Sequence, residues 1–381
     1  MSRFDEFVYP IPKRYSERGD VYASPKAYFL GNESLKNSRL RMGFSVVLKP
    51  TLAGYPHFHH SIEEYYLFSG SDLVDFFDFD AEIDIWFGED PDEMEKYTIT
   101  KPGIVRIPPG MWHGPIHYRN VRKPVAFSPV YFDGEISKIT RRIKADGTVE
   151  YPSIVTGLGG DLLRPSLAFA YEWAKKLVAT GQTKHTGKYD KYFYEYPVEH
   201  HQYGDTYANP RGKFRGITQM PEARFYGGFS VVLKDTNMEV PHIHYSNDEY
   251  LWFIGADLEN VFDFDAEIEI DLGWSPDDME TITITEPTVI RVPPNMWHCP
   301  INFKRITKPV AFFPVYPDGD WSKVLCRKNE NGELEYLFEA ASLRKCSYNH
   351  EKICIYCGKC VGDSNVTPFG VFTYKREGDA K

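Results

Sequence analysis

Short apolar segments, separated by Gly, Pro and Asp, run through most of the chain and predict strands rather than helices. The segments that begin at Ala81 (AEIDIWF) and Ala266 (AEIEIDL) alternate apolar and acidic residues, which is typical of a strand with one face in water. The segments TITKPGIVRIPPGMW and TITEPTVIRVPPNMW each indicate strand, turn and strand, with paired prolines ending the second strand. Many short strands without intervening helices favour an all-β fold of closed antiparallel barrels or jelly rolls.

One stretch, residues 161–181, has a helical pattern instead. Pro165 suits the first helical position, and Phe169, Trp173 and Leu177 recur every four residues. Gly181 follows and can end the helix. We expect this helix to brace the first barrel.

The chain repeats itself with an offset of 185 residues. The segment GFSVVLK at Gly43 returns at Gly228, and FDFDAEI at Phe77 returns at Phe262. No gap is needed between the two copies, which indicates two copies of one structural unit. We therefore expect a first repeat over residues 1–160, a helical brace and linker over 161–187, a second repeat over 188–343 and a Cys-rich tail over 344–381.

Composition excludes several classes of protein. The chain has 381 residues, of which 42% are hydrophobic and 15% aromatic, as in folded proteins with real cores. A formal charge of −10 and a pI of about 5.7 argue against a nucleic-acid binder and against a basic membrane-binding patch. The first residues, MSRFDEF, lack the apolar stretch of a signal peptide, and no segment approaches the ~20 apolar residues of a membrane span. We expect a cytoplasmic protein with a small-molecule partner, and a homo-oligomer stays open.

Each repeat carries three histidines and a glutamate at the same spacing. On a strand, residues two apart point to one face, so an HxH pair delivers two imidazoles into one barrel interior. A third histidine follows a double-Pro turn and can close the set from across the barrel. The expected ligands of a divalent transition metal are His57, His59, Glu64 and His113 in the first repeat, and His242, His244, Glu249 and His298 in the second.

The identity of the carboxylate ligand has an alternative. Glu63 precedes Glu64 and fits the spacing at least as well when counted back from Gly70. In the second repeat, position 248 is Asp, whereas position 249 is again Glu. A shorter carboxylate should not reach the same metal from the same backbone, so we favour Glu64 and Glu249.

These motifs resemble those of the cupin superfamily, and in particular of its two-barrel members, the bicupins. The first cupin motif is HxH followed closely by Glu, and the second is a Pro-Gly turn before a lone His; both occur twice here, between about residues 20 and 325. The resemblance implies two tandem cupin barrels of the double-stranded β-helix or jelly-roll type. It also implies a divalent transition metal in each barrel, such as Fe, Mn, Ni or Zn, and either an enzyme or a non-catalytic binding protein.

Five further residues are candidates for the wall of a substrate pocket. Arg106 and Arg291 match by the repeat and could orient a carboxylate or enolate, or could instead be outward-facing and paired with acidic residues. Trp112 and Trp297 adjoin the third histidine, where they pack the rim or wall the pocket. Tyr66 is Leu in the second repeat, which predicts that the two pockets differ in chemistry.

The Cys-rich tail has its own metal-binding pattern. Its cysteines, in the run CIYCGKC and just before it, have the spacing of a four-cysteine zinc site, although free thiols or a redox pair are the alternative. The expected zinc ligands are Cys346, Cys354, Cys357 and Cys360.

Three histidines and one carboxylate leave one or two positions of an octahedral metal ion open. The leading hypothesis is therefore a metal-dependent enzyme that acts on a small oxygen-rich substrate, with an iron dioxygenase as the first interpretation. The alternatives are a redox-neutral isomerase or decarboxylase that uses Mn, Zn or Ni, and a protein that binds metal or ligand without turnover. Neither the substrate nor the identity of the metal follows from the sequence.

Overall fold

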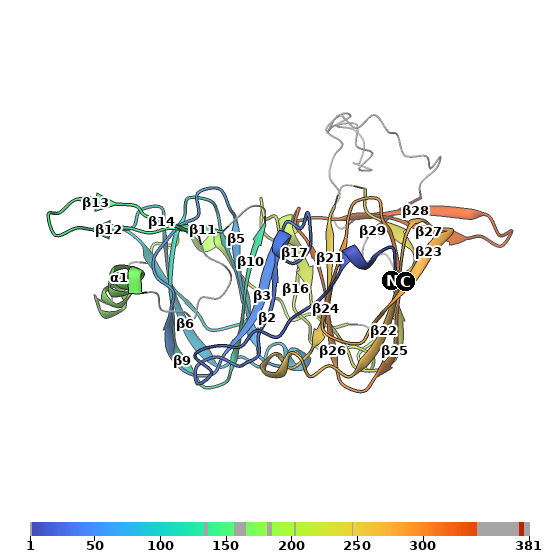
Figure 1. The fold of residues 1–381 in the computed structure, drawn as a ribbon, viewed down its shortest axis with the longest axis horizontal. Coiled ribbons are helices and arrows are strands. Elements are labelled where there is room, and N and C mark those ends of the chain that lie inside the picture. Colours follow the sequence, from blue (N-terminus) through green and yellow to red (C-terminus); the bar gives the residue numbers. More distant parts are fainter. Residues whose placement is uncertain are drawn as a thin grey trace, which may run out of the picture.

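A computed structural model describes residues 2–132, 136–155, 165–180, 185–201, 203–245, 247–340 and 373–376. Two β barrels lie side by side, barrel one at the left of Figure 1 and barrel two at the right. Strands dominate both barrels, as the alternation of apolar and polar residues predicts. Among the helices that the structure describes, none is long and apolar enough to cross a membrane.

Barrel one consists of two antiparallel sheets that face each other. The larger sheet, in spatial order, contains β15 (Phe193–Glu195), β8 (Gly103–Ile107), β5 (Glu64–Gly70), β10 (Val125–Phe132), β3 (Leu40–Val47) and β2 (Ala27–Leu30). The smaller sheet contains β4 (Thr51–Ala53), β9 (Trp112–Val121), β6 (Ala81–Gly88) and β7 (Glu95–Ile99).

Barrel two repeats this arrangement with longer sheets. One sheet contains β1 (Val8–Pro10), β24 (Thr288–Val292), β21 (Glu249–Gly255), β26 (Val310–Tyr316), β17 (Tyr226–Gly228) and β16 (Lys213–Phe214), with β18 (Ser230–Val232) also on β26. The other contains β23 (Asp278–Ile284), β22 (Ala266–Ser275), β25 (Trp297–Ile306), β20 (His242–Ile243), β27 (Ser322–Lys328), β28 (Leu334–Ala340) and β29 (Thr373–Arg376), with β19 (Thr236–Met238) also on β25.

The smaller elements lie mainly outside these sheets. The short 3-10 helices are η1 (Asp5–Phe7), η2 (Gly31–Glu33), η3 (Leu73–Asp75), η4 (Pro165–Leu167), η5 (Asp190–Tyr192), η6 (Gly216–Thr218) and η7 (Leu258–Asn260). Two small two-stranded sheets pair β11 (Ser137–Ile139) with β14 (Ser153–Val155), and β12 (Arg142–Ile143) with β13 (Val149–Glu150).

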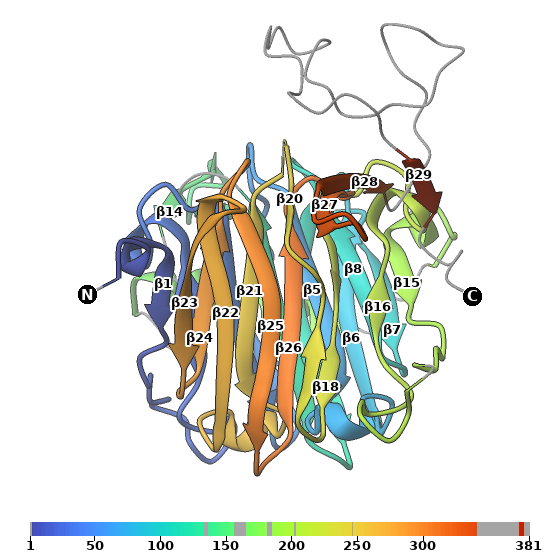
Figure 2. The same cartoon turned by 90° about the vertical axis from the view of Figure 1, so that its right-hand side faces the viewer.

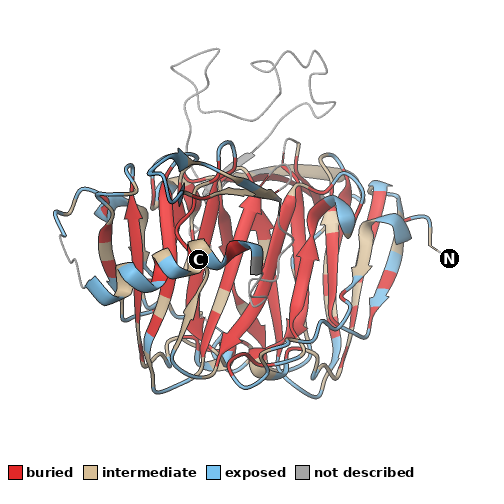
Figure 3. Ribbon diagram, turned by 60° about the vertical axis from the view of Figure 1, so that its left-hand side comes forward, coloured by how far each residue is buried: buried red, intermediate tan, exposed pale blue. Residues whose placement is uncertain are grey.

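A third hydrophobic core joins the two barrels, in addition to the core inside each one. It fills the space between the two sheets that face each other across the junction. There the Phe44 ring meets Trp252 edge-on at 5.4 Å, and the Phe229 and Phe313 rings stack at 4.0 Å. Figure 3 shows the resulting pattern, with buried residues along the strands and exposed residues in the loops. Burial of this much aromatic surface stabilises the pair of barrels as one unit.

The junction has an approximate two-fold symmetry. The Leu73 amide donates to the Ala256 carbonyl at 2.9 Å, and the Leu258 amide donates to the Ser71 carbonyl at 2.9 Å. These four residues are related by the 185-residue offset, so each barrel makes the same contact with the other. The two copies of the repeat therefore meet through a self-complementary interface.

The repeats also exchange their first strands. β1, which begins the first repeat, pairs with β24 of barrel two, and β15, which begins the second repeat, pairs with β8 of barrel one. Figure 2 shows both arms at the outer edges of their host sheets. Each arm covers a sheet edge that would otherwise present unpaired backbone groups.

The helix α1 (Ala168–Thr180) lies on the outside of barrel one (Figure 1). It follows η4, which starts at Pro165, and it buries Ala170 and Ala174 against Tyr55. The predicted helix is thus confirmed over its central part, because residues 161–164 and Gly181 lie outside the described residues.

Candidate metal centres

The structure brings the predicted histidines and glutamates together in both barrels. In each barrel, one donor atom from each of the four side chains lies within 4.8 Å of the other three, and all four residues are buried. Site one consists of His57, His59, Glu64 and His113, and site two consists of His242, His244, Glu249 and His298.

The two facing sheets of a barrel share each site. In barrel one, His113 lies on β9, and His57 is held beside it by backbone bonds in both directions, of 3.0 and 2.8 Å. Glu64 begins β5 in the opposite sheet. The chain therefore turns between His59 and Glu64, which explains why their five-residue spacing does not fit a single straight strand.

Backbone carbonyls orient every ligand histidine. The Nδ1 atom of each ring lies 2.6 to 3.1 Å from a carbonyl oxygen, and a carbonyl can only accept, so Nδ1 carries the proton. Each Nε2 lone pair then points at the site. The acceptors are the carbonyls of Tyr55, Ser137, Met111, Val240, Ser322 and Met296, for His57, His59, His113, His242, His244 and His298 respectively.

Several polar atoms of the sites are buried without a hydrogen-bond partner. These atoms include Nε2 of His57, His113 and His298. Burial holds the pKa of His57 and His242 well below the ordinary histidine value, which keeps these imidazoles neutral. Neutral, orphaned and convergent nitrogens fit a divalent metal, because the metal supplies the partner that they lack.

The carboxylates complete this donor set. The Glu64 Oε2 atom lies 3.0 Å from Nε2 of both His59 and His113. Because Nδ1 carries the proton, these Nε2 atoms cannot donate to Oε2, so all three atoms are acceptors that converge on one point. In site two, Glu249 Oε2 likewise lies 3.2 Å from Nε2 of His244 and 3.0 Å from Nε2 of His298. Three neutral imidazoles and one carboxylate therefore offer a net charge of −1 to a divalent cation.

The ambiguity between Glu63 and Glu64 is resolved by the position of Glu63 at the barrel junction. Glu63 pairs with Arg106 and accepts a hydrogen bond from the Tyr65 hydroxyl, away from site one. Its counterpart Asp248 pairs with Arg291 in the same way. The change from Glu to Asp at this position is tolerated because neither residue belongs to the metal set.

The prediction that Arg106 and Arg291 orient a substrate is wrong. Arg106 lies opposite Tyr65 in the β5–β8 register, so it shares the face of Tyr65 and not that of Glu64. The Arg106 guanidinium also donates to the Pro221 carbonyl at 3.2 Å, and that of Arg291 donates to the Lys36 carbonyl at 3.4 Å. Both arginines therefore hold the two barrels together.

The two candidate tryptophans pack outside the barrels and are not pocket walls. Trp112 precedes the inward His113, so it faces outward, where its ring meets Phe58 at 4.9 Å and Trp173 of α1 at 5.8 Å. Trp297 likewise meets Tyr336 of β28 at 6.2 Å. The rim-packing alternative is the one that the structure supports.

Tyr66, in contrast, lies inside barrel one. It is two residues beyond Glu64 on β5, and its ring centroid is 5.9 Å from that of His113. Its counterpart Leu251 lines the cavity of barrel two. The interiors of the two barrels therefore differ, as the exchange of Tyr for Leu predicts.

A cavity of about 260 Å³ lies in barrel two and reaches site two. We call it cavity two. His242, Glu249 and His298 form part of its wall, so site two faces the cavity. Its other lining residues include Arg211, Lys213, Leu251, Cys299, Tyr316, Glu239 and Lys323.

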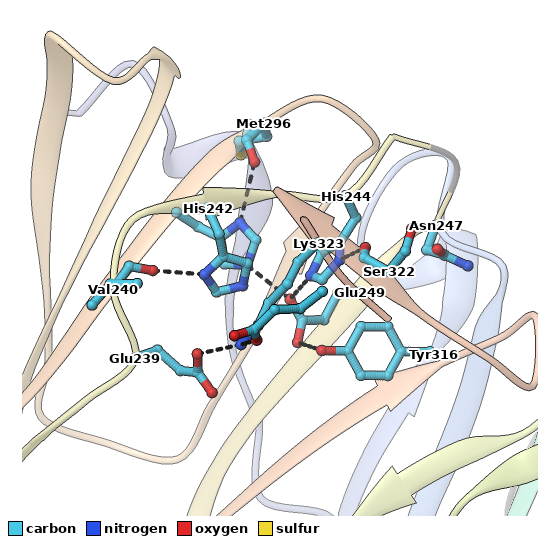
Figure 4. A network of polar contacts seen from close by, with 12 residues as sticks. Glu239, Val240, His242, His244, Asn247, Glu249, Met296, Tyr316, Ser322 and Lys323 are labelled. Carbon is cyan, nitrogen blue, oxygen red and sulfur yellow. Dashed lines mark hydrogen bonds and ion pairs between the residues drawn. The ribbon is translucent and has the colours of Figure 1, made fainter. Parts of the chain in front are cut away.

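Two contacts in cavity two were not predicted from the sequence. The Tyr316 hydroxyl donates to Glu249 Oε1 at 2.5 Å, and the Lys323 amine lies 2.6 Å from Glu239 Oε2 (Figure 4). A sequence signal existed for the second contact, because Glu239 corresponds to Gly54 in the first repeat. Gly54 has no carboxylate, so the corresponding positions of barrel one cannot form this ion pair.

The structure describes Cys299 but not the four cysteines of the tail. Cys299 is a buried free thiol that lines cavity two beside His298. The proposed zinc ligands of the tail, Cys346, Cys354, Cys357 and Cys360, lie outside the described residues.

No protein-family model and no curated protein matches the chain. Among solved structures, the chain is similar to an oxalate decarboxylase from Lactobacillus farciminis in a formate complex, at 11% identity and a TM-score of 0.49, over 84% of this chain and 88% of that one. It is also similar to a mutant oxalate decarboxylase from Bacillus subtilis, at 12% identity and a TM-score of 0.49, over 84% of this chain and 79% of that one. With both TM-scores below 0.5, neither similarity indicates an activity for this chain. The strand pairing and the two matched ligand sets themselves identify the architecture.

Proposed function

We propose that the chain, with two barrels and a buried set of three histidines and one glutamate in each, is a cupin-type metal-dependent enzyme that acts on a small, oxygen-rich organic substrate. The observation that carries this proposal is the position of site two at the wall of cavity two. At about 260 Å³, that cavity is somewhat smaller than the ~300 to 1,000 Å³ of pockets for drug-sized ligands, which favours a small molecule.

The bound metal would act as a Lewis acid toward an oxygen atom of the substrate. The protein's own contribution is to hold the ligands rigid. Each histidine is fixed by a backbone carbonyl, and Glu249 is fixed by Tyr316. Such outer contacts set ring orientation and ligand basicity. Leu251 and Ile301 add apolar side chains to the wall of the cavity.

An iron-dependent dioxygenase is our first hypothesis for the reaction. A redox-neutral isomerase or decarboxylase is the second, and one observation favours it. The ion pair between Glu239 and Lys323 lines cavity two, where it offers both a proton acceptor and a proton donor to a ligand. Reactions that proceed through an enolate or lose carbon dioxide need such groups.

Two measurements test the proposal: the identity of the metal in the purified protein, and the consumption of oxygen by its Fe(II) form. Protein purified without added metal should contain iron if the dioxygenase hypothesis holds, and Mn, Ni or Zn if the reaction is redox-neutral. The Fe(II) form, held without oxygen, should show a changed absorption or magnetic spectrum with small 2-oxo acids, β-diketones or catechols. Admission of oxygen should then consume oxygen and form product. Ligand binding without oxygen uptake, and without turnover in the Mn, Ni, Zn and Co forms, would contradict the enzyme hypothesis. It would favour a protein that binds its ligand without turnover.

A further inference from the structure

Lys138 is a lysine of barrel one that the proposed function does not use. It lies on β11, between two residues whose backbones hold the first HxH segment. The Ser137 carbonyl accepts a hydrogen bond from His59 Nδ1 at 2.8 Å. Ile139 exchanges backbone bonds of 3.0 and 2.9 Å with Phe58. The backbone of Lys138 is therefore fixed beside site one.

The Lys138 side chain is only partly exposed, and its charge is felt at site one. Burial, followed by the positive charge of Lys138, lowers the pKa of His57. Lys323 is the counterpart of Lys138 by the 185-residue offset. It lines cavity two together with His242 and Glu249 (Figure 4). Each barrel thus places one lysine near its metal site.

In barrel two, this lysine is held in an ion pair. The Lys323 amine lies 2.6 Å from Glu239 Oε2 and 3.5 Å from Glu339 Oε2. Burial lowers the pKa of Lys323, but the two carboxylates outweigh burial, and the pKa is raised. An ammonium group that is paired in this way has no free electron pair and is a poor nucleophile.

Neither carboxylate has a counterpart in barrel one. Across β11 and β14, Lys138 lies opposite Ile154, at the position that Glu339 occupies across β27 and β28. Gly54 takes the position of Glu239. Among the residues that the structure describes, the Lys138 amine has no ion pair and no hydrogen bond, and burial lowers its pKa. A lysine without a counter-ion in a partly buried place is typical of lysines that react as free amines.

The space of the missing carboxylate is open. A Cβ atom added to Gly54 would have no heavy atom within 4 Å. The backbone is the same in both barrels, because Gly54 has a φ of 68° and Glu239 has a φ of 64°. The two positions therefore differ in the side chain and not in the path of the chain. Barrel one leaves room where barrel two has the carboxylate that pairs with its lysine.

We propose that Lys138 is a covalent site for small aldehydes and ketones, whose carbonyl carbon its amine attacks to form an imine. The bond between Nζ and carbon forms first and gives a carbinolamine. The C–O bond then breaks, and the oxygen leaves as water with the two protons of the amine. No oxidant or reductant is consumed. Lys323 is not such a site, and the inference does not depend on the reaction proposed for the metal.

Reductive trapping of the imine tests the inference. The full chain is loaded with Zn²⁺, which has no redox chemistry of its own, and is incubated with dilute propanal and cyanoborohydride. Peptide mass spectrometry then gives the rate at which each lysine is modified. Lys138 should react about tenfold or more faster than Lys323 and than the exposed Lys36, because a free amine reacts and an ammonium ion does not.

Gly54→Glu is the matched control variant. It gives barrel one the carboxylate that pairs with Lys323, at a backbone position where Glu239 already shows that glutamate is accepted. The rate at Lys138 should fall to that of Lys323, and the metal content should not change. Lys138→Arg should remove the fast adduct and leave the slow modification of surface lysines. A native Lys138 that reacts no faster than Lys36 or Lys323, or a Lys138 rate that Gly54→Glu does not lower, would overturn the inference.

Discussion

Arg106 and Glu63 form a paired ion contact at the barrel junction, with Arg106 Nε 3.1 Å from Glu63 Oε1 and Arg106 Nη2 3.0 Å from Glu63 Oε2. Both side chains are less than one-tenth exposed. Glu63 is adjacent in sequence to Glu64, yet Glu63 directly precedes β5 and contacts Arg106, whereas Glu64 begins β5 and belongs to site one. One stabilises the junction and the other completes site one.

Replacement of these two glutamates should therefore have different effects. Glu64→Ala should weaken the affinity of site one for metal by more than the ~10- to 100-fold that loss of an outer contact costs, because a ligand itself is removed, so site one should lose its metal on purification. Glu63→Ala should leave the metal content unchanged but lower the free energy of unfolding by about 3 kcal/mol or less, because the buried Arg106 loses its paired contact and keeps only the longer ion pair with Glu222 at 3.4 Å. Elemental analysis and denaturant unfolding measure the two quantities. Metal loss in Glu63→Ala with retention in Glu64→Ala would show that the ligand assignment is reversed.

Both barrels should hold metal at once. Each ligand set is complete and buried, so we expect about two transition-metal ions per chain in the barrels, apart from any tail zinc. The double variant His57→Ala/His59→Ala should lose one ion and keep the other, and His242→Ala/His244→Ala should do the converse. A saturated protein with a metal-free barrel would contradict this expectation.

Glu239 should matter for turnover and not for metal binding. It lines cavity two and pairs with Lys323 but is not a member of site two. If it moves a proton, Glu239→Gln should lower kcat by about 100-fold or more, with little change in KM or in metal content. The comparison with Glu239→Asp, which keeps an ionisable group, separates proton transfer from packing. Unchanged kcat in Glu239→Gln would exclude this role.

The tail prediction can be tested independently of the barrels. Simultaneous replacement of Cys354, Cys357 and Cys360 by Ser should release one zinc per chain, because three of four expected thiolate ligands are removed. The metals of sites one and two should remain. Zinc content that does not change in the triple variant would leave the tail cysteines as free thiols or a redox pair.

Local patterns of the sequence were sufficient for much of the fold and for most of the metal ligands. The period-two alternation of β6 and β22, the 185-residue offset and the two HxH pairs are properties of short segments. A strand places residues two apart on one face whatever surrounds it, so the pairs His57/His59 and His242/His244 could be assigned without tertiary information. Because each ligand of the first repeat recurs 185 residues later, the repeat then predicted site two from site one.

The tertiary structure decided which face of each strand meets which neighbour. Arg106 and Trp112 lie close in sequence to His113, but one faces the other barrel and the other faces α1. The exchange of β1 and β15 between barrels, and the grouping of Arg211, Lys213 and Lys323 around one cavity, join segments far apart in the chain. Such contacts depend on how the sheets pack against one another. No local period in a sequence carries that information, because it arises only when distant segments are brought into contact.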